Sequence, residues 1–99
     1  MVEPFSNAAG VFGKRLRAIR TGLALSQEEV AHLAEIHPTN YGKLERGRAN
    51  PNMETIIRIS TVLGVEPGEL LQGLTTADYP GHQHNVTAKE WLEARQRMR

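Results

Sequence analysis

The chain contains no cysteine, few aromatic residues and no long apolar segment. The lack of cysteine excludes disulfide bonds and thiolate metal sites, so one hydrophobic core must hold the 99 residues together. No segment approaches the roughly 18 apolar residues that a membrane-spanning helix needs, and residues 1–10 lack the features of a signal peptide. We therefore expect a small cytoplasmic domain without a membrane partner.

The net charge of +1 conceals a segregation of charge along the chain. Residues 11–25 hold four basic side chains and no acidic one, whereas residues 26–37 hold three acidic side chains and no lysine or arginine. Basic patches on a nearly neutral chain suit a partner that carries phosphate, provided that folding brings them to one side. On charge alone, a solvated helix face is the simpler explanation.

Hydrophobic periodicity and helix-boundary residues predict five short helices. The second opens with a capping box at Ser26 and Glu29. The third begins at Pro38, because proline suits the first turn of a helix and pushes the preceding residue out of helical geometry. Gly47 and Gly64 end the third and fourth helices. The five predicted helices span residues 12–22, 26–35, 38–46, 53–63 and 67–71.

The sequence after the fifth predicted helix has a different character. Residues 74–86 show no apolar period and are rich in turn-forming residues, which predicts a linker. A further capping box at Thr87 and Glu90 then starts an amphipathic helix over residues 87–99. Ala88, Trp91, Leu92 and Met98 lie on one side of this helix, although Arg95 interrupts the stripe.

Residue types with catalytic or metal-binding chemistry are sparse. His82 and His84 form an H-x-H pair, but the sequence offers no evident third ligand for zinc. No serine, histidine and acid occur in a recognisable nucleophile motif, and no glycine-rich phosphate loop follows a strand. We therefore expect no enzyme, no metal site and no cofactor.

Four short motifs, taken in order, resemble a known family. They are LSQEEVA at Leu25–Ala31, LERG at Leu44–Gly47, NP at Asn50 and Pro51, and LGVxP at Leu63–Pro67. Over Leu16–Leu71 the chain is similar to the DNA-binding domain of the phage-repressor and Cro-like (XRE-like) helix-turn-helix family. The resemblance implies an all-α, five-helix lambda-repressor-like bundle, to which this chain adds a C-terminal helix. The expected parts are a flexible N-terminal arm at 1–10, a helix-turn-helix domain at 11–73, a linker at 74–86 and an amphipathic helix at 87–99.

The resemblance further implies a transcriptional regulator that binds specific double-stranded DNA. The third helix, at about residues 38–46, would enter the major groove while the second lies near the backbone. Because one helix contacts few base pairs, a homodimer on an inverted-repeat operator is expected, in a bacterial or phage system and associated with the nucleoid. The first turns of the third helix reach base edges, so the expected base contacts are Thr39, Asn40 and Lys43.

Other residues are expected to contact the DNA backbone. Gln27 resembles the family residue that holds a phosphate at the start of the second helix, with plain solvation as its alternative. Of the first-helix cations, which include Arg15, one or two are expected to contact phosphate and the rest to be solvated. The expected backbone contacts are Gln27, Pro38, Arg46, Arg48, Asn50, Asn52, Lys14 and Arg17. The family also pairs an arginine with a glutamate between its first and third helices, which implies a structural ion pair between Arg20 and Glu45.

Two residues, Glu35 and Tyr41, depart from the family pattern, and Gly42 is unusual inside so short a helix. Glu35 stands where the turn often has glycine, and a left-handed conformation there would cost on the order of 1 kcal/mol. Tyr41 replaces a branched aliphatic residue; either its ring fills the core with the hydroxyl at the surface, or the helix is tilted. Gly42 costs about 1 kcal/mol against alanine inside a helix, so we expect a close neighbour there, such as DNA backbone, or else a tolerated surface glycine.

The interface between protomers is expected at leucines after the fifth helix, extended by the C-terminal helix. One alternative is that the C-terminal helix caps its own bundle. A second is a protein-interaction module, antitoxin-like or polymerase-binding, that uses the Trp91 helix and binds DNA secondarily. A third, a sequence-indifferent DNA-packaging protein, is disfavoured by the modest net charge. The expected dimer or partner residues are Leu70, Leu71, Leu74, Trp91, Leu92 and Met98.

Overall fold

The computed structural model describes residues 3–79, 81 and 86–98, and within these residues it contains helices and no strand. The all-α fold class is therefore confirmed. None of the described helices is both long and apolar enough to cross a membrane. The elements are α1 (Asn7–Gly22), α2 (Gln27–Leu33), α3 (Pro38–Glu45), α4 (Met53–Leu63), α5 (Pro67–Leu71), a 3₁₀ turn η1 (Thr76–Asp78) and α6 (Ala88–Arg97).

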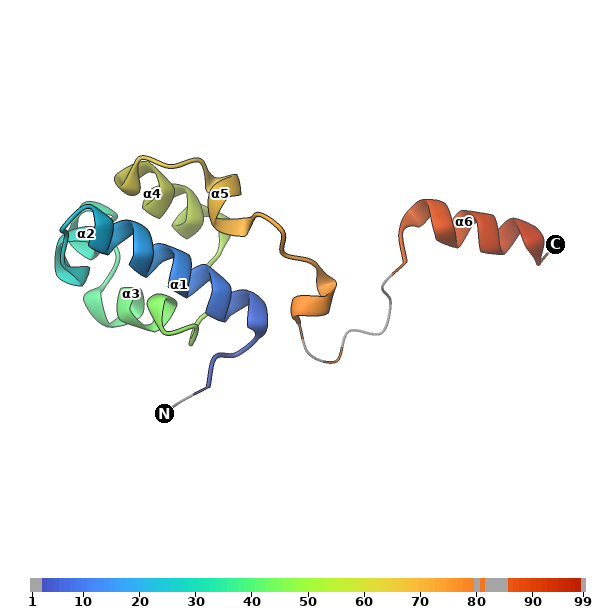
Figure 1. Ribbon diagram of the computed structural model, residues 1–99, viewed down its shortest axis with the longest axis horizontal. Helices are drawn as coiled ribbons and strands as arrows, with labels where there is room; N and C mark the ends of the chain where they lie inside the picture. The colour runs from blue at the N-terminus through green and yellow to red at the C-terminus, as the bar shows by residue number, and fades with distance from the viewer. Residues whose placement is uncertain (1–2, 80, 82–85, 99) are drawn as a thin grey trace.

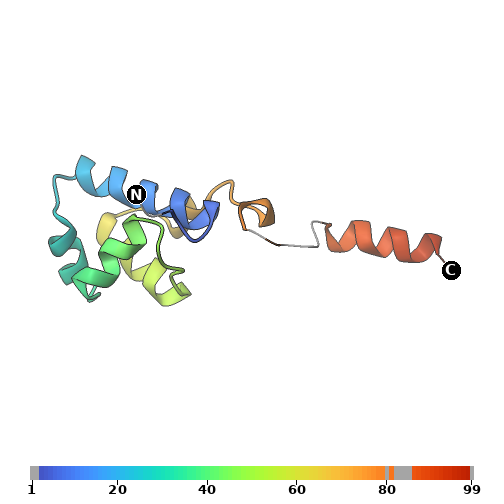
Figure 2. The same cartoon turned by 90° about the horizontal axis from the view of Figure 1, so that it is seen from below.

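The first five helices form a bundle, and the sixth lies apart from it (Figure 1, Figure 2). In the bundle α1 packs on α3 and α5, α2 packs on α3 and α4, and α4 packs on α5. No residue of α6 is buried. The core consists of Phe12, Leu16, Val30, Ala31, Ala34, Tyr41, Leu44, Ile59, Leu63 and Leu70.

The predicted starts of the second, third and fourth helices are present, because each depends on local capping chemistry. The Ser26 hydroxyl accepts from the Glu29 N–H while the Glu29 carboxylate accepts from the Ser26 N–H, as a capping box requires. Asn52 caps α4 by accepting from the Thr55 N–H at 2.8 Å. Gly64 follows α4 in the left-handed region, with φ 70°.

The N-terminal boundary was predicted too late. Helix α1 begins at Asn7, because the Ser6 side chain caps it by accepting from the Ala9 N–H at 3.0 Å. Ala8 and Ala9 are buried, so this first turn belongs to the bundle and not to a flexible arm at 1–10. The segment before the cap is also attached, since the Phe5 N–H donates to the Gly47 carbonyl at 2.8 Å.

The linker predicted at 74–86 is likewise only partly a linker. Its first residues form η1, and the Asp78 carboxylate accepts a hydrogen bond from the Asn7 side chain. Tyr79 and Leu74 line a small hollow against the start of α1. This part of the chain therefore packs on the bundle. His82 and His84 lie outside the described residues.

Leu70 corrects the predicted dimer surface. Its side chain is fully buried in the bundle core, so it stabilises the monomer and cannot contact a second protomer. Leu71, one residue later, is 41% exposed, and Leu74 is half-buried. Of the predicted interface residues, Leu71, Leu74 and those of α6 therefore remain candidates for a contact between protomers.

Candidate nucleic-acid interface

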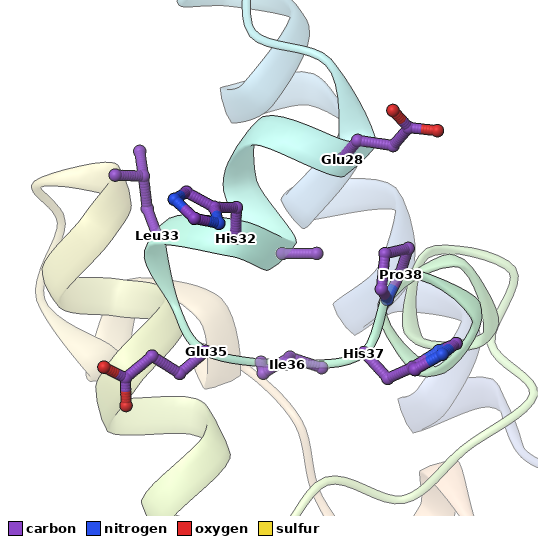
Figure 3. Close-up of a pocket in the computed structure, with 8 residues that line it drawn as sticks. Glu28, His32, Leu33, Glu35, Ile36, His37 and Pro38 are labelled. Carbon is purple, nitrogen blue, oxygen red and sulfur yellow. The ribbon is translucent and has the colours of Figure 1, made fainter.

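Helices α2 and α3 are joined by a tight four-residue turn, residues 34–37 (Figure 3). Glu35 adopts φ 57°, which is the left-handed region, and Ile36 donates its N–H to the Ala31 carbonyl at 2.8 Å. A side chain in this conformation costs on the order of 1 kcal/mol, so the turn keeps its shape despite the lack of glycine. Ala24, after α1, has a similar φ of 58° that the sequence did not indicate.

The three predicted base-contacting residues lie on one sector of α3. Thr39, Asn40 and Lys43 are all exposed, and among the described residues none of their side chains has a hydrogen-bond or ion-pair partner. Positions i, i+1 and i+4 of a helix fall within about 100° of each other around its axis. The helix begins at Pro38, as predicted, and its cap is His37, whose Nδ1 accepts from the Thr39 N–H. This sector of α3, which carries Thr39, Asn40 and Lys43 and is called its front below, is thus free for an external ligand.

A shallow hollow of about 220 Å³ separates this sector from the start of α4. Asn40 and Lys43 line it on one side, and Asn50, Asn52 and Thr55 on the other. The Asn52 side-chain oxygen is occupied by the cap of α4, whereas Asn50 is exposed. These polar groups form one continuous surface with the front of α3.

Two arginines follow α3 and differ in their freedom. Arg46 is exposed, and its guanidinium lies 3.0 Å from the position a Cβ would take on Gly42. Arg48 is half-buried; its Nη1 donates to the Glu3 carbonyl, and its Cζ lies 4.6 Å from the centroid of the Phe5 ring. Sequence reasoning missed this second set of contacts.

Gln27 has a partner inside the protein. Its amide nitrogen donates to the Glu45 carboxylate at 2.9 Å, so only its second amide N–H remains for a phosphate. On α1, Lys14 and Arg17 are exposed, whereas Arg15 donates to the Leu70 carbonyl at 3.1 Å. Arg15 therefore ties α1 to α5, whereas the side chains of Lys14 and Arg17 have no hydrogen-bond or ion-pair partner among the described residues.

The structure brings Arg20 and Glu45 together. Two parallel hydrogen bonds, at 2.6 and 3.0 Å, join the guanidinium to the carboxylate, and Arg20 also donates to the Leu25 carbonyl at 2.9 Å. Burial alone would raise the pKa of Glu45, but hydrogen bonds from Arg20 and Gln27 outweigh it and hold that pKa below its ordinary value. The hydrogen bond to Glu45 likewise raises the pKa of Arg20. Both groups stay charged at neutral pH.

Tyr41 and Gly42 are both buried in α3. Tyr41 is completely buried, hydroxyl included, and that hydroxyl forms no hydrogen bond with the described residues although the Glu45 carboxylate is nearby. The prediction that its hydroxyl reaches the surface is wrong. Burial, together with the nearby Glu45 carboxylate, raises the pKa of Tyr41. The close neighbours of Gly42 are the Arg46 and Gln27 side chains.

Gly13 is a structural residue that sequence reasoning missed. A Cβ added there would lie 2.5 Å from the Leu44 carbonyl oxygen and closer still to that of Glu45. Helix α1 therefore crosses the end of α3 at backbone contact. The available signal was Gly13 itself, because a glycine inside a predicted helix costs about 1 kcal/mol against alanine.

A surface hollow of about 710 Å³ runs along α2 and the turn (Figure 3). Glu28, His32, Glu35 and His37 line it, but the two carboxylates point away from each other and the two rings lie on opposite sides. Within the part of the chain that the structure describes, no three histidine or acidic residues form a group that could hold a metal ion. The hollow therefore offers no metal site.

Helix α6 presents the predicted apolar residues to solvent. Trp91 is 52% exposed, Leu92 41% and Met98 88%. The Arg95 guanidinium lies 5.0 Å from the centroid of the Trp91 ring and covers part of this face. The helix has the amphipathic character that the sequence predicted, but its apolar side has no partner among the described residues.

A family model described as helix-turn-helix matches residues 16–70, which is more than half of the chain. The chain belongs to the helix-turn-helix family. This is the phage-repressor and Cro-like group that the motifs indicated, whose members are transcriptional regulators that bind DNA and do not catalyse reactions.

Two curated relatives are similar to this chain in sequence. The control protein C.BamHI of Bacillus amyloliquefaciens is 37% identical over 71 residues, covering 71% of this chain and 88% of that protein. The SPbeta prophage-derived uncharacterized HTH-type transcriptional regulator YonR of Bacillus subtilis (strain 168) is 40% identical over 63 residues, covering 64% of this chain. The match spans 58% of YonR, so the two proteins correspond only over the shared domain.

Two solved structures share the fold. The restriction-modification controller protein C.AhdI from Aeromonas hydrophila superposes with a TM-score of 0.61 at 40% identity, covering 63% of this chain and 94% of that one. The P22 c2 repressor, solved in complex with a synthetic operator, superposes with a TM-score of 0.60 at 28% identity, covering 64% and 96%. Both matches therefore cover a part of this chain that is about as long as the helical bundle.

Proposed function

We propose that this protein is a sequence-specific regulator that binds an inverted-repeat operator as a homodimer, with α3 in the major groove. The observation that carries the proposal is the front of α3, where Thr39, Asn40 and Lys43 are exposed and unpaired among the described residues. Since these side chains have no partner within the described residues, their donors and acceptors are available to an external ligand. A B-DNA major groove, roughly 12 Å wide, admits one helix.

Each of the three side chains has a chemistry suited to a base edge. An asparagine amide can bond adenine in a bidentate manner, a lysine ammonium can donate to guanine, and a threonine can bond an edge or contact a thymine methyl. The side chains that flank this cluster suit phosphate oxygens; they are Arg46, Asn50 and Gln27 with its free N–H. Contacts to phosphate fix the register of a protein on DNA but do not recognise its sequence. Lys14, Arg17, Pro38, Arg48 and Asn52 complete the proposed backbone contacts.

The proposed dimer follows from the size of the contact. A single helix in a groove contacts few base pairs, so two copies on half-sites about one helical turn apart are needed for specificity. Leu71 and Leu74 lie near each other at one end of the bundle and suit a symmetric apolar contact. The P22 c2 repressor, a relative in fold and sequence, was solved with an operator, which supports the groove-binding geometry. Such a regulator acts in the cytoplasm, on the nucleoid, by blocking or recruiting polymerase.

The experiment that tests the proposal is selection of binders from a random duplex library at near-physiological salt, since affinity depends steeply on salt. Enrichment of an inverted repeat with half-sites about 10 bp apart supports a dimer that recognises sequence. A strong salt dependence without any enriched sequence would instead indicate sequence-indifferent binding and contradict the proposal.

One observation favours a second candidate, a protein-interaction module. Helix α6 stands apart from the bundle and exposes Trp91, Leu92 and Met98 (Figure 1). Such a face suits a partner helix or a second protomer. Deletion of residues 87–99 separates the two uses: loss of the dimer in light scattering assigns α6 to self-association, and an unchanged dimer with intact operator binding leaves α6 for another protein.

A further inference from the structure

The N-terminal residues 3–5 form a strap across the loop that follows α3. The Phe5 N–H donates to the Gly47 carbonyl at 2.8 Å, which fixes the strap against the loop at the end of α3. Two further contacts then hold Arg48: the Glu3 carbonyl accepts from its Nη1, and the Phe5 ring lies 4.6 Å from its Cζ. One short segment therefore engages both an edge and a face of the same guanidinium.

Gly47 allows the strap to lie this close. It adopts φ 71°, and a Cβ there would lie 2.7 Å from Pro4 Cβ and 2.9 Å from Gly10 Cα. Only glycine satisfies both the left-handed backbone and the lack of space. The strap, the loop and the start of α1 are thus packed together at backbone distance, and Arg48 projects from this packed unit.

We propose that the strap positions Arg48 to bind a DNA phosphate, with Phe5 as the positioning residue. This inference rests on the proposed function, in which Arg48 contacts the backbone. A guanidinium carries five N–H donors in one plane, and the Glu3 carbonyl is bonded to Nη1 alone, so donors remain for a phosphate oxygen. The ring contact restricts the positions that the guanidinium takes, and the half-buried side chain keeps part of its surface exposed.

The strap acts by restricting the free protein. A free arginine side chain samples many rotamers, and ordering it on DNA costs affinity. An arginine already held by Phe5 and Glu3 loses less freedom on binding. Cation–π contacts at exposed sites contribute enough to change an equilibrium about two- to fivefold, which sets the size of the expected effect.

The test titrates a fluorescent duplex of arbitrary sequence at several low salt concentrations, because phosphate contacts supply non-specific binding and no operator is needed. The variants are Phe5→Leu, which removes the ring, Phe5→Trp, which keeps one, Arg48→Ala and the double variant Phe5→Leu with Arg48→Ala. Phe5→Leu is expected to weaken binding about two- to fivefold and Phe5→Trp to bind like the parent. Arg48→Ala is expected to weaken binding further and to lower the salt slope by about 1. In the Arg48→Ala background, Phe5→Leu is expected to have no effect.

Two control variants match the changes elsewhere in the chain. Tyr79→Leu removes another half-exposed aromatic ring, and Arg58→Ala removes another exposed positive charge. Melting temperatures are measured for all variants, because Phe5 is 51% exposed and its loss should leave the core intact. An effect equal to that of Tyr79→Leu would show that the Phe5 ring has no special role.

The remaining outcomes distinguish this inference from the proposed function. If Phe5→Leu weakens binding equally with and without Arg48, or not at all while Arg48→Ala does, the positioning role is overturned and the phosphate contact stands. If Arg48→Ala changes neither affinity nor salt slope while an operator is still enriched, the inference fails and the proposed function remains. If the parent protein binds no duplex even at low salt, both fail.

Discussion

The Glu45 carboxylate accepts two hydrogen bonds from one edge of the Arg20 guanidinium, from Nε to Oε2 at 2.6 Å and from Nη2 to Oε1 at 3.0 Å. The side chain of Glu45 is 2% exposed and that of Arg20 12%. Gln27 donates to the same carboxylate, so α1, α2 and α3 meet at one group. Because α3 carries the proposed base contacts, this cluster fixes the orientation of that helix within the bundle.

Arg20→Ala is expected to destabilise the protein by roughly 3–5 kcal/mol, because it leaves the buried carboxylate of Glu45 without its counter-charge. Urea denaturation at pH 7 measures the change. The matched control is Arg58→Ala, which breaks two exposed ion pairs, with Glu54 and with Glu35, and should cost no more than about 1 kcal/mol. Equal stability of the Arg20 and Arg58 variants would contradict a structural role for the buried pair.

The same pair predicts a specific acid sensitivity. The pKa of Glu45 in the folded state lies below its ordinary value of 4.5, so its contribution to stability is complete above pH 4.5 and is lost as the pH falls through the folded pKa. The difference in unfolding free energy between the parent and Glu45→Gln should therefore be constant from pH 5.5 to pH 7 and shrink below about pH 4.5. Denaturation series at several pH values measure it, with the exposed Glu54→Gln as control. A difference that stays constant down to pH 3 would exclude this linkage.

The helix boundaries that the sequence predicted well are those with local causes. Each of these boundaries depends on neighbours in sequence, because a side chain satisfies an end amide within one turn or a proline lacks that amide. The residues are Ser26 with Glu29, Asn52 and Pro38. Ser6 carries the same signal for α1 and was overlooked, because the small residues Ala8 and Ala9 contribute little to an apolar period. The family motifs supplied the order of the helices and the position of α3.

The features that the sequence could not give depend on packing between distant segments. Leu70 and Leu71 are adjacent in a five-residue helix, where periodicity cannot decide which one faces the core. The contacts of Arg48 with residues 3–5 join distant segments, since Arg48 and Glu3 lie 45 positions apart in the sequence. Such contacts are set by the assembled bundle, so the sequence could not indicate which partners Gln27 and Arg48 have inside the protein.

Gly13→Ala is expected to destabilise the bundle by about 1–3 kcal/mol or more, because the new Cβ meets backbone that cannot move aside. Thermal unfolding followed by circular dichroism measures the loss. Gly22→Ala in the same helix is the control, since nothing lies within 4 Å of its Cβ position. That substitution should be neutral or stabilise by up to about 1 kcal/mol. If the two alanine variants unfold alike, α1 and α3 do not meet as described.

Leu71→Glu is expected to dissociate the proposed dimer without unfolding the protomer, because a charge would enter an apolar contact between copies while Leu71 itself is 41% exposed. Light scattering gives the mass, and the melting temperature checks the fold. Leu33→Glu is the control, with the same chemistry at a leucine that is 58% exposed on α2. A dimer that survives Leu71→Glu would move the interface to α6 or to another face.

Lys43→Ala and Arg46→Ala are expected to affect binding in different ways, although each removes one positive charge from the same helix end. Lys43 belongs to the proposed base contacts, so its loss should relax preference at one operator position by about 1–3 kcal/mol. Arg46 is proposed to contact phosphate, so its loss should weaken binding to all sequences alike and lower the salt slope by about 1. Titrations of both variants against the selected operator and its single-base substitutions measure this contrast. If Lys43→Ala leaves the preference unchanged at every position and weakens all duplexes equally, Lys43 contacts backbone, and base recognition must come from Thr39 and Asn40 alone.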